Sequence, residues 1–262
     1  MSKVEATSLP FDEAIQFFRG KTNVPTEAWR DLQKEQHDRA FVVAGATKAE
    51  LLADLRTAVD KAIAEGTTLE TFRKDFDQVV AKHGWEFKGD PAWRSRVIYE
   101  TNVRTAYAAG RYAQQTEPAF LERNPYWEWR HGDSRHPRPQ HLAWNGMILL
   151  ASDPFWVARY PPCDWGCQCS VFALSQGAID RQGLQVLSKP PKPLAGPGPG
   201  EVLPGVGEGW DYTPGASVRQ HLVPQVLDRA KELPRAIRAD LVKEIEAFLE
   251  ETASVATKGA TR

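Results

Sequence analysis

The sequence has no long hydrophobic run and little cysteine. Its 262 residues include three cysteines, and no stretch approaches the roughly 20 consecutive apolar residues that a membrane-spanning helix needs. The first residues, MSKVEATSLPFDEA, lack the apolar core of a secretory signal peptide. We therefore expect no membrane association and a chain made in a reducing cytoplasm. Clustered thiols in that compartment indicate metal binding or reactivity rather than a disulfide framework.

An excess of charge of either sign is also missing. Lys and Arg together number 33 and Asp and Glu 34, which gives a formal net charge of −1. Non-specific nucleic-acid binding usually depends on a basic excess, so the overall charge does not favour it, although a local basic patch stays open. The hydrophobic content of 42% is typical of a folded chain of one or two domains with a substantial core.

The first third of the chain has the periodicity of helices. Residues 47–66 place apolar side chains on one helical face, begin with a predicted capping box of Thr47 and Glu50, and end at Gly66. Residues 67–84 repeat this design with Thr67 as the cap, and the short link predicts an antiparallel helical hairpin.

Two further helices are expected upstream, over residues 11–20 and 26–45, the second less regular because polar residues interrupt its apolar stripe. We assign no chemistry to this helical bundle. His37 and His83 are interpreted as ordinary solvated histidines on helices.

A long helix is predicted next, starting at Asp90 before a proline and running without a breaker to Gly110 or beyond. Glu100 and Arg104 have the spacing of a surface ion pair on this helix. The alternative interpretation is that Tyr99, Glu100 and Arg104 face the polar loops that follow and hold them in place.

Beyond this helix, three short segments have the character of strands: residues 125–131, 146–152 and 169–175. The sequence thus predicts an α+β fold: an N-terminal helical bundle, a long helix, a small antiparallel sheet with long loops, a Pro/Gly arm and C-terminal helices.

The predicted organisation has four parts: an N-terminal helical region at 1–86, a core region at 87–178, a Pro/Gly-rich linker at 179–217 and a C-terminal helical tail at 218–262. The linker looks too long and too rich in proline to belong to a compact core. The tail is interpreted as an attachment element, because its apolar stripe must dock either on this chain or on a partner. That stripe consists of Ile237, Leu241, Ile245, Phe248 and Leu249.

All three cysteines lie in PPCDWGCQC, residues 161–169. Together with a histidine from the preceding loop, they would supply four ligands for tetrahedral Zn²⁺ and would hold two long loops together. The histidine is either His141 or His136. The favoured set is His141, Cys163, Cys167 and Cys169.

Other interpretations of the cysteines stay open. The thiols could be unliganded and packed beside Trp165, because a free cysteine behaves as a small hydrophobic residue. A reactive or redox role is the third possibility. A site with four protein ligands would be closed, so the zinc predicted here is structural rather than catalytic.

Six motifs occur in order along the chain: FVVAG, YETNVRTAYAAGRY, YWEWRHGDSRHPRPQH, NGMIL, DPFWVARYPPCDWGCQCSV and GWDYTPG. In this order they resemble the phage Mu F-like family of minor head proteins, also called phage head morphogenesis proteins, over residues from about 9 to about 220. The positions that match the family pattern are Asp133, Arg135, His141, Pro161, Pro162, Cys167 and Cys169. Family members often carry histidine where this chain has Arg159, and other residues in place of Cys163 and Asp164.

The resemblance implies a non-enzymatic virion component with no catalytic residues and no small-molecule substrate. Such a protein would be made in the host cytoplasm and present in few copies inside the phage head, near the portal vertex. It would aid the assembly of DNA-filled heads. The implied partners are the portal protein and the major capsid protein, with the packaged DNA as a further candidate.

Two alternatives come from the residues themselves. A metal-dependent hydrolase or nuclease could use Asp133, His136 or His141 and Glu100 around a metal. Against this hypothesis, the sequence has no nucleophile elbow, HExxH motif or phosphate-binding loop.

The second alternative is a DNA-binding surface made of arginine and tryptophan side chains. The residues of this hypothesis are Arg123, Arg130, Arg135, Arg138, Arg159, Trp127, Trp129 and Trp156. The competing interpretation, which we favour, is that these tryptophans belong to the core and that the arginines pair with nearby acids.

Overall fold

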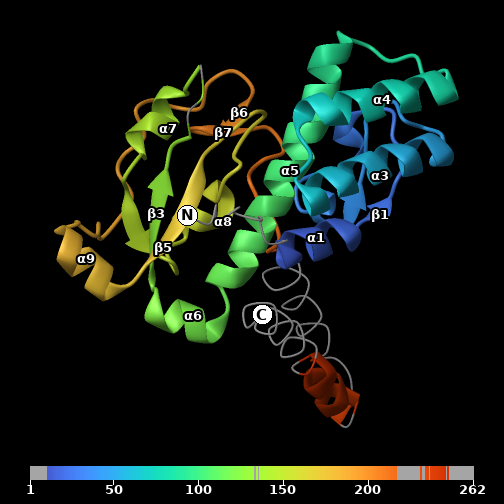
Figure 1. The fold of residues 1–262 in the computed structure, drawn as a ribbon. Helices are drawn as coiled ribbons and strands as arrows, with labels where there is room; N and C mark the ends of the chain where they lie inside the picture. Colours follow the sequence, from blue (N-terminus) through green and yellow to red (C-terminus); the bar gives the residue numbers. More distant parts are fainter. Residues whose placement is uncertain are drawn as a thin grey trace, which may run out of the picture.

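The computed structural model describes residues 11–132, 134, 136–216, 231, 234–235, 237–245 and 247. Asp133 and Arg135, both of which match the family pattern, lie outside the described residues, and so does most of the predicted tail. The described chain forms a helical lobe (residues 11–89) and a sheet lobe (residues 116–193), with one long helix running between them (Figure 1). The predicted α+β class is confirmed.

The long helix is α5, Pro91–Gln115, about 37 Å in length at 1.5 Å per residue. Asp90 caps it as predicted: a side-chain oxygen of Asp90 accepts a hydrogen bond of 2.9 Å from the backbone N–H of Trp93. Gly110 lies inside this helix because α1 packs closely there. A β-carbon at Gly110 would lie 2.8 Å from the backbone nitrogen of Ala14.

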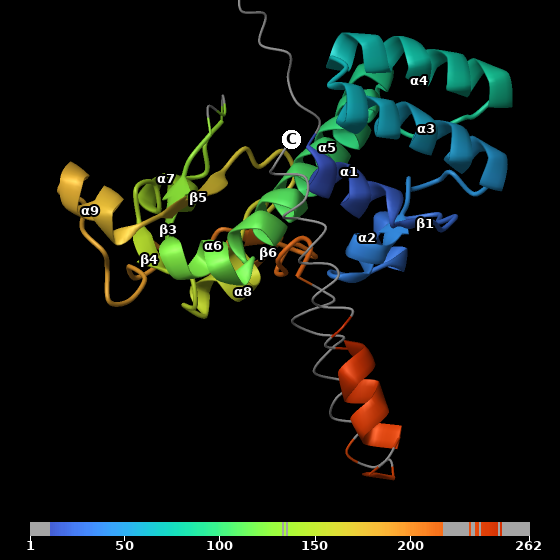
Figure 2. The same cartoon turned by 60° about the horizontal axis from the view of Figure 1, so that its bottom comes forward.

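The helical lobe contains α1 (Asp12–Arg19), α3 (Ala49–Glu65) and α4 (Leu69–His83), all of which pack against α5 (Figures 1 and 2). The predicted antiparallel hairpin of α3 and α4 is confirmed. Burying each large apolar side chain in this lobe stabilises the fold by about 1.5–3 kcal/mol. The fully buried ones include Phe18, Phe41, Leu51, Leu52, Leu55, Phe72 and Phe76.

The helix ends differ in part from the prediction. Both predicted stop positions, Gly66 and Gly84, have the left-handed conformation, with φ of 68° and 56°. The predicted N-terminal caps are displaced by one residue. Lys48 precedes α3 without a side-chain cap, and Thr68 rather than Thr67 caps α4.

The helix predicted over residues 26–45 is wrong. The segment contains the 3₁₀ turn η1 (Trp29–Asp31), the single-turn helix α2 (Gln36–Arg39) and strand β2 (Ala40–Phe41), which pairs in parallel with β1 (Thr22–Asn23). Tertiary contacts override the weak helical pattern. The ring of Trp29 stacks on His37 with centroids 3.7 Å apart, so His37 is buried and not solvated as expected.

The sheet lobe is built on three antiparallel strands in the order β4-β3-β5, which confirms the predicted small sheet. The strands are β3 (Tyr126–Arg130), β4 (Ile148–Leu150) and β5 (Ser170–Leu174). Short helices that the sequence did not predict occupy the connections. These are α6 (Pro118–Arg123), α7 (Pro139–Ala143), α8 (Phe155–Arg159) and α9 (Gln176–Gln182).

Residues 194–216, here called the arm, pack against the sheet lobe and do not form the predicted linker. The arm contains the paired strands β6 (Glu201–Leu203) and β7 (Val206–Gly207). Val206 and Trp210 are buried in the core of the sheet lobe. The sequence did not predict this packing, because proline and glycine suppress the periodicity by which a regular element is recognised. The few apolar residues between them nevertheless fill the core.

The tail is described only in part, and residues 237–245 are helical, as predicted after Pro234. Phe248 and Leu249 of the predicted stripe lie outside the described residues. The attachment role stays a prediction, and so do the bounds of the four parts, although the described residues of the third part from 194 onward pack on the sheet lobe and do not act as a linker. Within the described ranges, no helix combines the length and the hydropathy needed to cross a bilayer.

The stack of His37 on Trp29 leads to a prediction about pH. Burial, followed by the charge of Lys21, lowers the pKa of His37 from 6.5 to about 4. Between these two pH values the unfolded chain binds a proton that the folded chain excludes, so the free energy of unfolding falls as the pH drops from 6.5 to 4, by about 2–3 kcal/mol. Denaturant titrations across this range should show a flatter profile for His37→Phe than for the wild type.

Replacement of the exposed His136 by Gln serves as the control and should leave the pH profile unchanged. Equal pH profiles for the wild type and His37→Phe would contradict the assignment of this acid sensitivity to His37.

Candidate functional site

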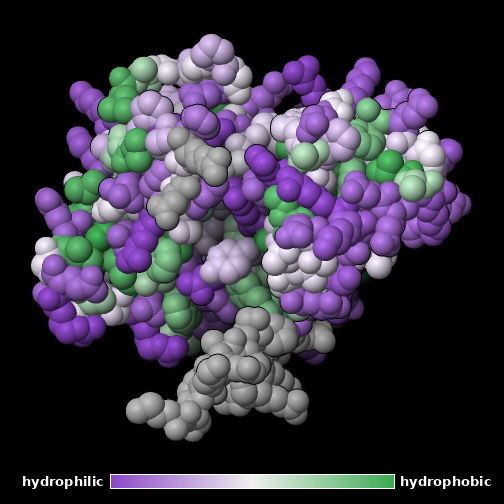
Figure 3. Space-filling view, turned by 45° about the horizontal axis from the view of Figure 1, so that its top comes forward, coloured by the Kyte–Doolittle hydropathy of each residue, from purple (hydrophilic) through white to green (hydrophobic). Residues whose placement is uncertain are grey.

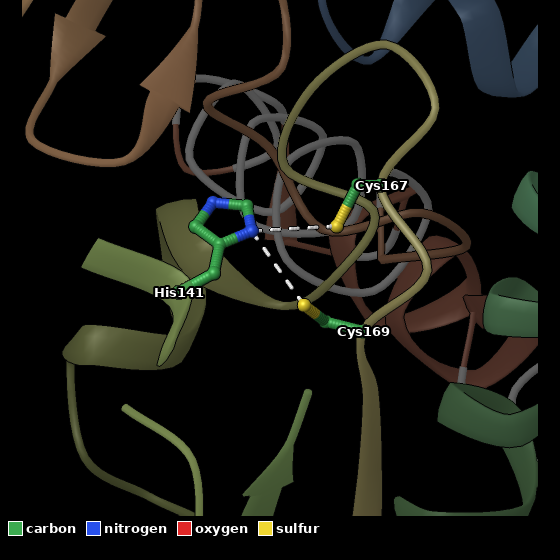
Figure 4. A group of neighbouring side chains, drawn as sticks. All are labelled: His141, Cys167 and Cys169. Carbon is green, nitrogen blue, oxygen red and sulfur yellow. Dashed lines mark hydrogen bonds between the residues drawn. The ribbon is translucent and has the colours of Figure 1, made fainter. Parts of the chain in front are cut away.

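His141, Cys167 and Cys169 meet at one point of the sheet lobe and are here called the His–Cys–Cys group (Figure 4). Nδ1 of His141 lies 3.5 Å from Sγ of Cys169 and 3.8 Å from Sγ of Cys167. One ligand atom from each residue lies within 4.8 Å of the other two. Cysteine and histidine are preferred ligands of zinc, so this group could hold a metal ion.

The orientation of His141 is set by the arm. Nε2 of the ring donates a hydrogen bond of 2.7 Å to the carbonyl oxygen of Gly205, which can only accept. The other nitrogen, Nδ1, therefore points to the two sulfurs. A backbone carbonyl that holds the second ring nitrogen is the usual arrangement around metal-binding histidines.

Gly205 could not be replaced easily at this position. Its φ is +74°, and a β-carbon there would lie 2.8 Å from the ring of Trp144 and 2.9 Å from Gln140. Sequence reasoning missed Gly205 because its contribution is a backbone carbonyl, which leaves no side-chain signal.

Cys163, the fourth predicted ligand, is not part of the group. Its side chain is fully buried in the core of the sheet lobe, next to the aromatic residues there. Its backbone carbonyl accepts a hydrogen bond of 2.9 Å from the N–H of Gly207 in the arm. The structure thus brings together three of the four predicted ligands, and His136, the alternative histidine, is exposed and outside the group.

Two arginines hold the loop that carries the cysteines. Arg104 of α5 donates from Nη1 to the carbonyl oxygens of Gly166 and Cys167, at 3.0 and 3.1 Å. Arg138 forms an ion pair of 2.8 Å with Asp164. The interpretation that Arg104 faces the loops is therefore confirmed, and its contact with Glu100 is a longer one of 3.6 Å.

Tyr99 does not join Arg104 in holding this loop. Its hydroxyl donates instead to the carbonyl oxygen of Thr67 in the helical lobe, at 2.7 Å. Of the predicted residues on α5, Arg104 contacts the cysteine loop, whereas Tyr99 contacts the helical lobe.

The protonation of the group is uneven. The largest effect on the pKa of Cys167 is a hydrogen bond from Cys169, which lowers it. Burial opposes this effect, but a hydrogen bond from His141 adds to it, so the pKa of Cys167 lies well below its ordinary value. The hydrogen bond to Cys167, together with burial, raises the pKa of Cys169. Burial on its own would lower the pKa of His141, but the hydrogen bond and charge of Cys167 raise it above the ordinary value. The group therefore concentrates negative charge on Cys167, which a cation would neutralise.

The tryptophans of the DNA-binding hypothesis are in the core, as the competing interpretation predicts. These buried residues are Trp127, Trp129 and Trp156. Arg130 pairs with Glu128 at 2.9 Å, and Arg159 lies over an aromatic ring. Because these three tryptophans are buried, their rings offer no stacking surface for nucleic-acid bases.

Comparison with known proteins adds to this picture. Residues 53–172 match the family described as Phage Mu protein F like protein. These residues belong to the Phage Mu protein F like family. The matched region contains the His–Cys–Cys group but ends before the arm, so Gly205, which orients His141, lies outside it.

Two relatives of this family extend the comparison. The Mu-like prophage FluMu F protein of Haemophilus influenzae is 41% identical over 171 residues, which cover 61% of this chain and 41% of that protein. The Putative capsid assembly protein F of Escherichia phage Mu is 37% identical over 196 residues, which cover 69% of this chain and 44% of that protein. The chain thus spans less than half the length of either relative. No solved structure matches it.

The contact of Arg104 with the cysteine loop can be tested directly. Arg104→Met keeps the apolar stem but removes two charge-assisted hydrogen bonds, so the loop should open more often, by a factor of about ten. Hydrogen exchange of the amides of residues 163–169 measures this opening. Arg96→Met, an exposed substitution on the same helix, should leave the exchange unchanged. Identical exchange in the two variants would show that Arg104 does not hold the loop.

Proposed function

We propose that this protein is a non-enzymatic minor component of a tailed-phage head that takes part in head assembly. The observation that carries the proposal is the 37% identity over 69% of the chain to a protein named Putative capsid assembly protein F. The ordered motifs of the phage Mu F-like family support the same role. Arg104 and Arg138 brace the loop that carries the cysteines, which is a structural use of these side chains and agrees with this role.

The proposal includes a location and partners. The resemblance to minor head proteins supports a position inside the head, near the portal vertex, in few copies per particle. The portal protein and the major capsid protein would be the contacts, and the protein would be made in the host cytoplasm before assembly. The predicted tail, at 218–262, would supply one of the attachment surfaces.

The head role can be tested in the phage or prophage that encodes this chain. We expect quantitative mass spectrometry of purified particles to find the protein at a small fraction of the major capsid copy number. Deletion of the gene should yield fewer DNA-filled heads by electron microscopy, and a chain truncated after residue 217 should fold but enter heads poorly. Absence from purified particles, or a copy number equal to that of the major capsid protein, would refute the proposal.

We also propose that the His–Cys–Cys group holds a structural zinc ion. The ion would link α7, which carries His141, to the loop that carries Cys167 and Cys169. The support is the chemistry of the donors, their mutual distances and the hydrogen bond that leaves Nδ1 of His141 directed at the sulfurs. Zinc binding and loop ordering would then be one equilibrium.

Elemental analysis of the purified chain tests the zinc. We expect one zinc per chain, and both Cys167→Ser and Cys169→Ser should lose the ion and several kcal/mol of unfolding free energy. Cys163→Ala is the matched control, because it removes a buried thiol outside the group; it should keep the zinc and cost only a packing contribution of about 1 kcal/mol. A folded wild-type chain without zinc would refute this part and leave the head role untouched.

A further inference from the structure

A cleft of about 390 Å³ lies between α5 and the segment of residues 160–172. Tyr107 and Arg111 of α5 and Phe172 of β5 are among the residues that line it. Tyr107 and Phe172 are both exposed. Figure 3 shows the surface of the two lobes, on which hydrophilic and hydrophobic residues lie next to one another. The cleft thus offers an apolar surface with a few polar groups, as ligand-binding clefts commonly do.

The charge of the cleft is one-sided. Arg104 and Arg111 line it, and none of its described lining residues is acidic. Glu100, behind the lining, pairs with Arg104 at 3.6 Å, which leaves Arg111 as the arginine without an acidic partner among the ion pairs of the described residues. Nη1 of Arg111 donates to the side-chain oxygen of Gln114 at 3.2 Å, a neutral partner. Arginine has a planar donor fork that matches a carboxylate, so the cleft is complementary to an anion.

The His–Cys–Cys group borders the same cleft. Cys167 and Cys169 are both among its lining residues, and Cys169 is only partly buried. Cys163, which would close a four-ligand site, is seated in the core instead. A zinc ion held by three protein ligands keeps a fourth position for another donor.

We infer that this cleft receives an acidic side chain of a partner protein, whose carboxylate takes the fourth position on the metal and pairs with Arg111. The inference rests on the structural zinc proposed above. A carboxylate oxygen is an ordinary zinc ligand, and the apolar residues beside the arginines accommodate the neighbouring side chains of a peptide. Nucleic-acid phosphate fits less well, because nucleic-acid binding uses many basic side chains. Only two arginines are among the described lining residues of the cleft, and the whole chain carries a net charge of −1.

The test uses the full chain with Co²⁺ in place of zinc, because visible absorption of cobalt reports a change of its ligands. A short peptide with one aspartate between two leucines should shift this absorption in a saturable way. The matched asparagine peptide, and the aspartate peptide with Arg111→Met, should bind at least tenfold more weakly. No shift with the aspartate peptide would overturn the inference. Equal affinity for acetate or inorganic phosphate would overturn the assignment to a protein segment.

The number of thiolate ligands separates this inference from the zinc proposal. The sulfur-to-cobalt charge-transfer absorption of the wild type should have the intensity of two thiolate ligands and should stay unchanged in Cys163→Ser. A drop by about one third in Cys163→Ser would mean a closed site with four protein ligands; it would overturn the open position but retain the metal. Failure to bind either metal would overturn the zinc proposal itself, and this inference with it.

Discussion

The sharing of one helix by two hydrophobic cores is the constraint on which the rest of the structure depends. Ile98 and Ala106 of α5 are buried in the core of the helical lobe, whereas Ala108 and Tyr112 are buried in the core of the sheet lobe. Because both cores pack on the same rigid rod, the lobes are held in a defined relation to each other. The position of Arg104 on this helix, facing the cysteine loop, follows from the same arrangement.

The His–Cys–Cys group depends on segments that are distant along the chain. Its histidine comes from a helix of five residues, its thiols from a loop braced by Arg104, and its orientation from the carbonyl of Gly205. None of these pieces has regular structure long enough to hold its own position. Their order comes from contacts with one another, which is the physical reason why a metal ion at their meeting point would stabilise all of them together.

Sequence reasoning succeeded where structure is local. The helices over 47–66 and 67–84 and the long helix after Asp90 have strong apolar periodicity and clear end signals, and all three are present. The prediction that Cys167 and Cys169 point to the same side also agrees with the structure, because alternate residues of an extended segment do so.

The failures share a different cause, which is control by distant contacts. No continuous helix forms over residues 26–45, because the stack of Trp29 on His37 requires a different path of the backbone. The arm was mistaken for a linker, because only the folded partner surface reveals that Val206 and Trp210 have a core to fill. Cys163 lies on the far side of a turn, so no spacing rule could show that its side chain enters the core rather than the His–Cys–Cys group.

The path of the arm also determines the order in which the protein can be completed during synthesis. A ribosome releases the chain from its N-terminus, so the helical lobe and α5 are available long before residue 205 emerges. Until then His141 lacks the carbonyl that directs its ring, and the core of the sheet lobe lacks Val206 and Trp210. The backbone N–H of Gly215 then donates to the side chain of Asp38, at 2.9 Å, and joins the last described part of the arm to the helical lobe. The site is therefore finished late in synthesis, together with the core of the sheet lobe and after the helical lobe and α5.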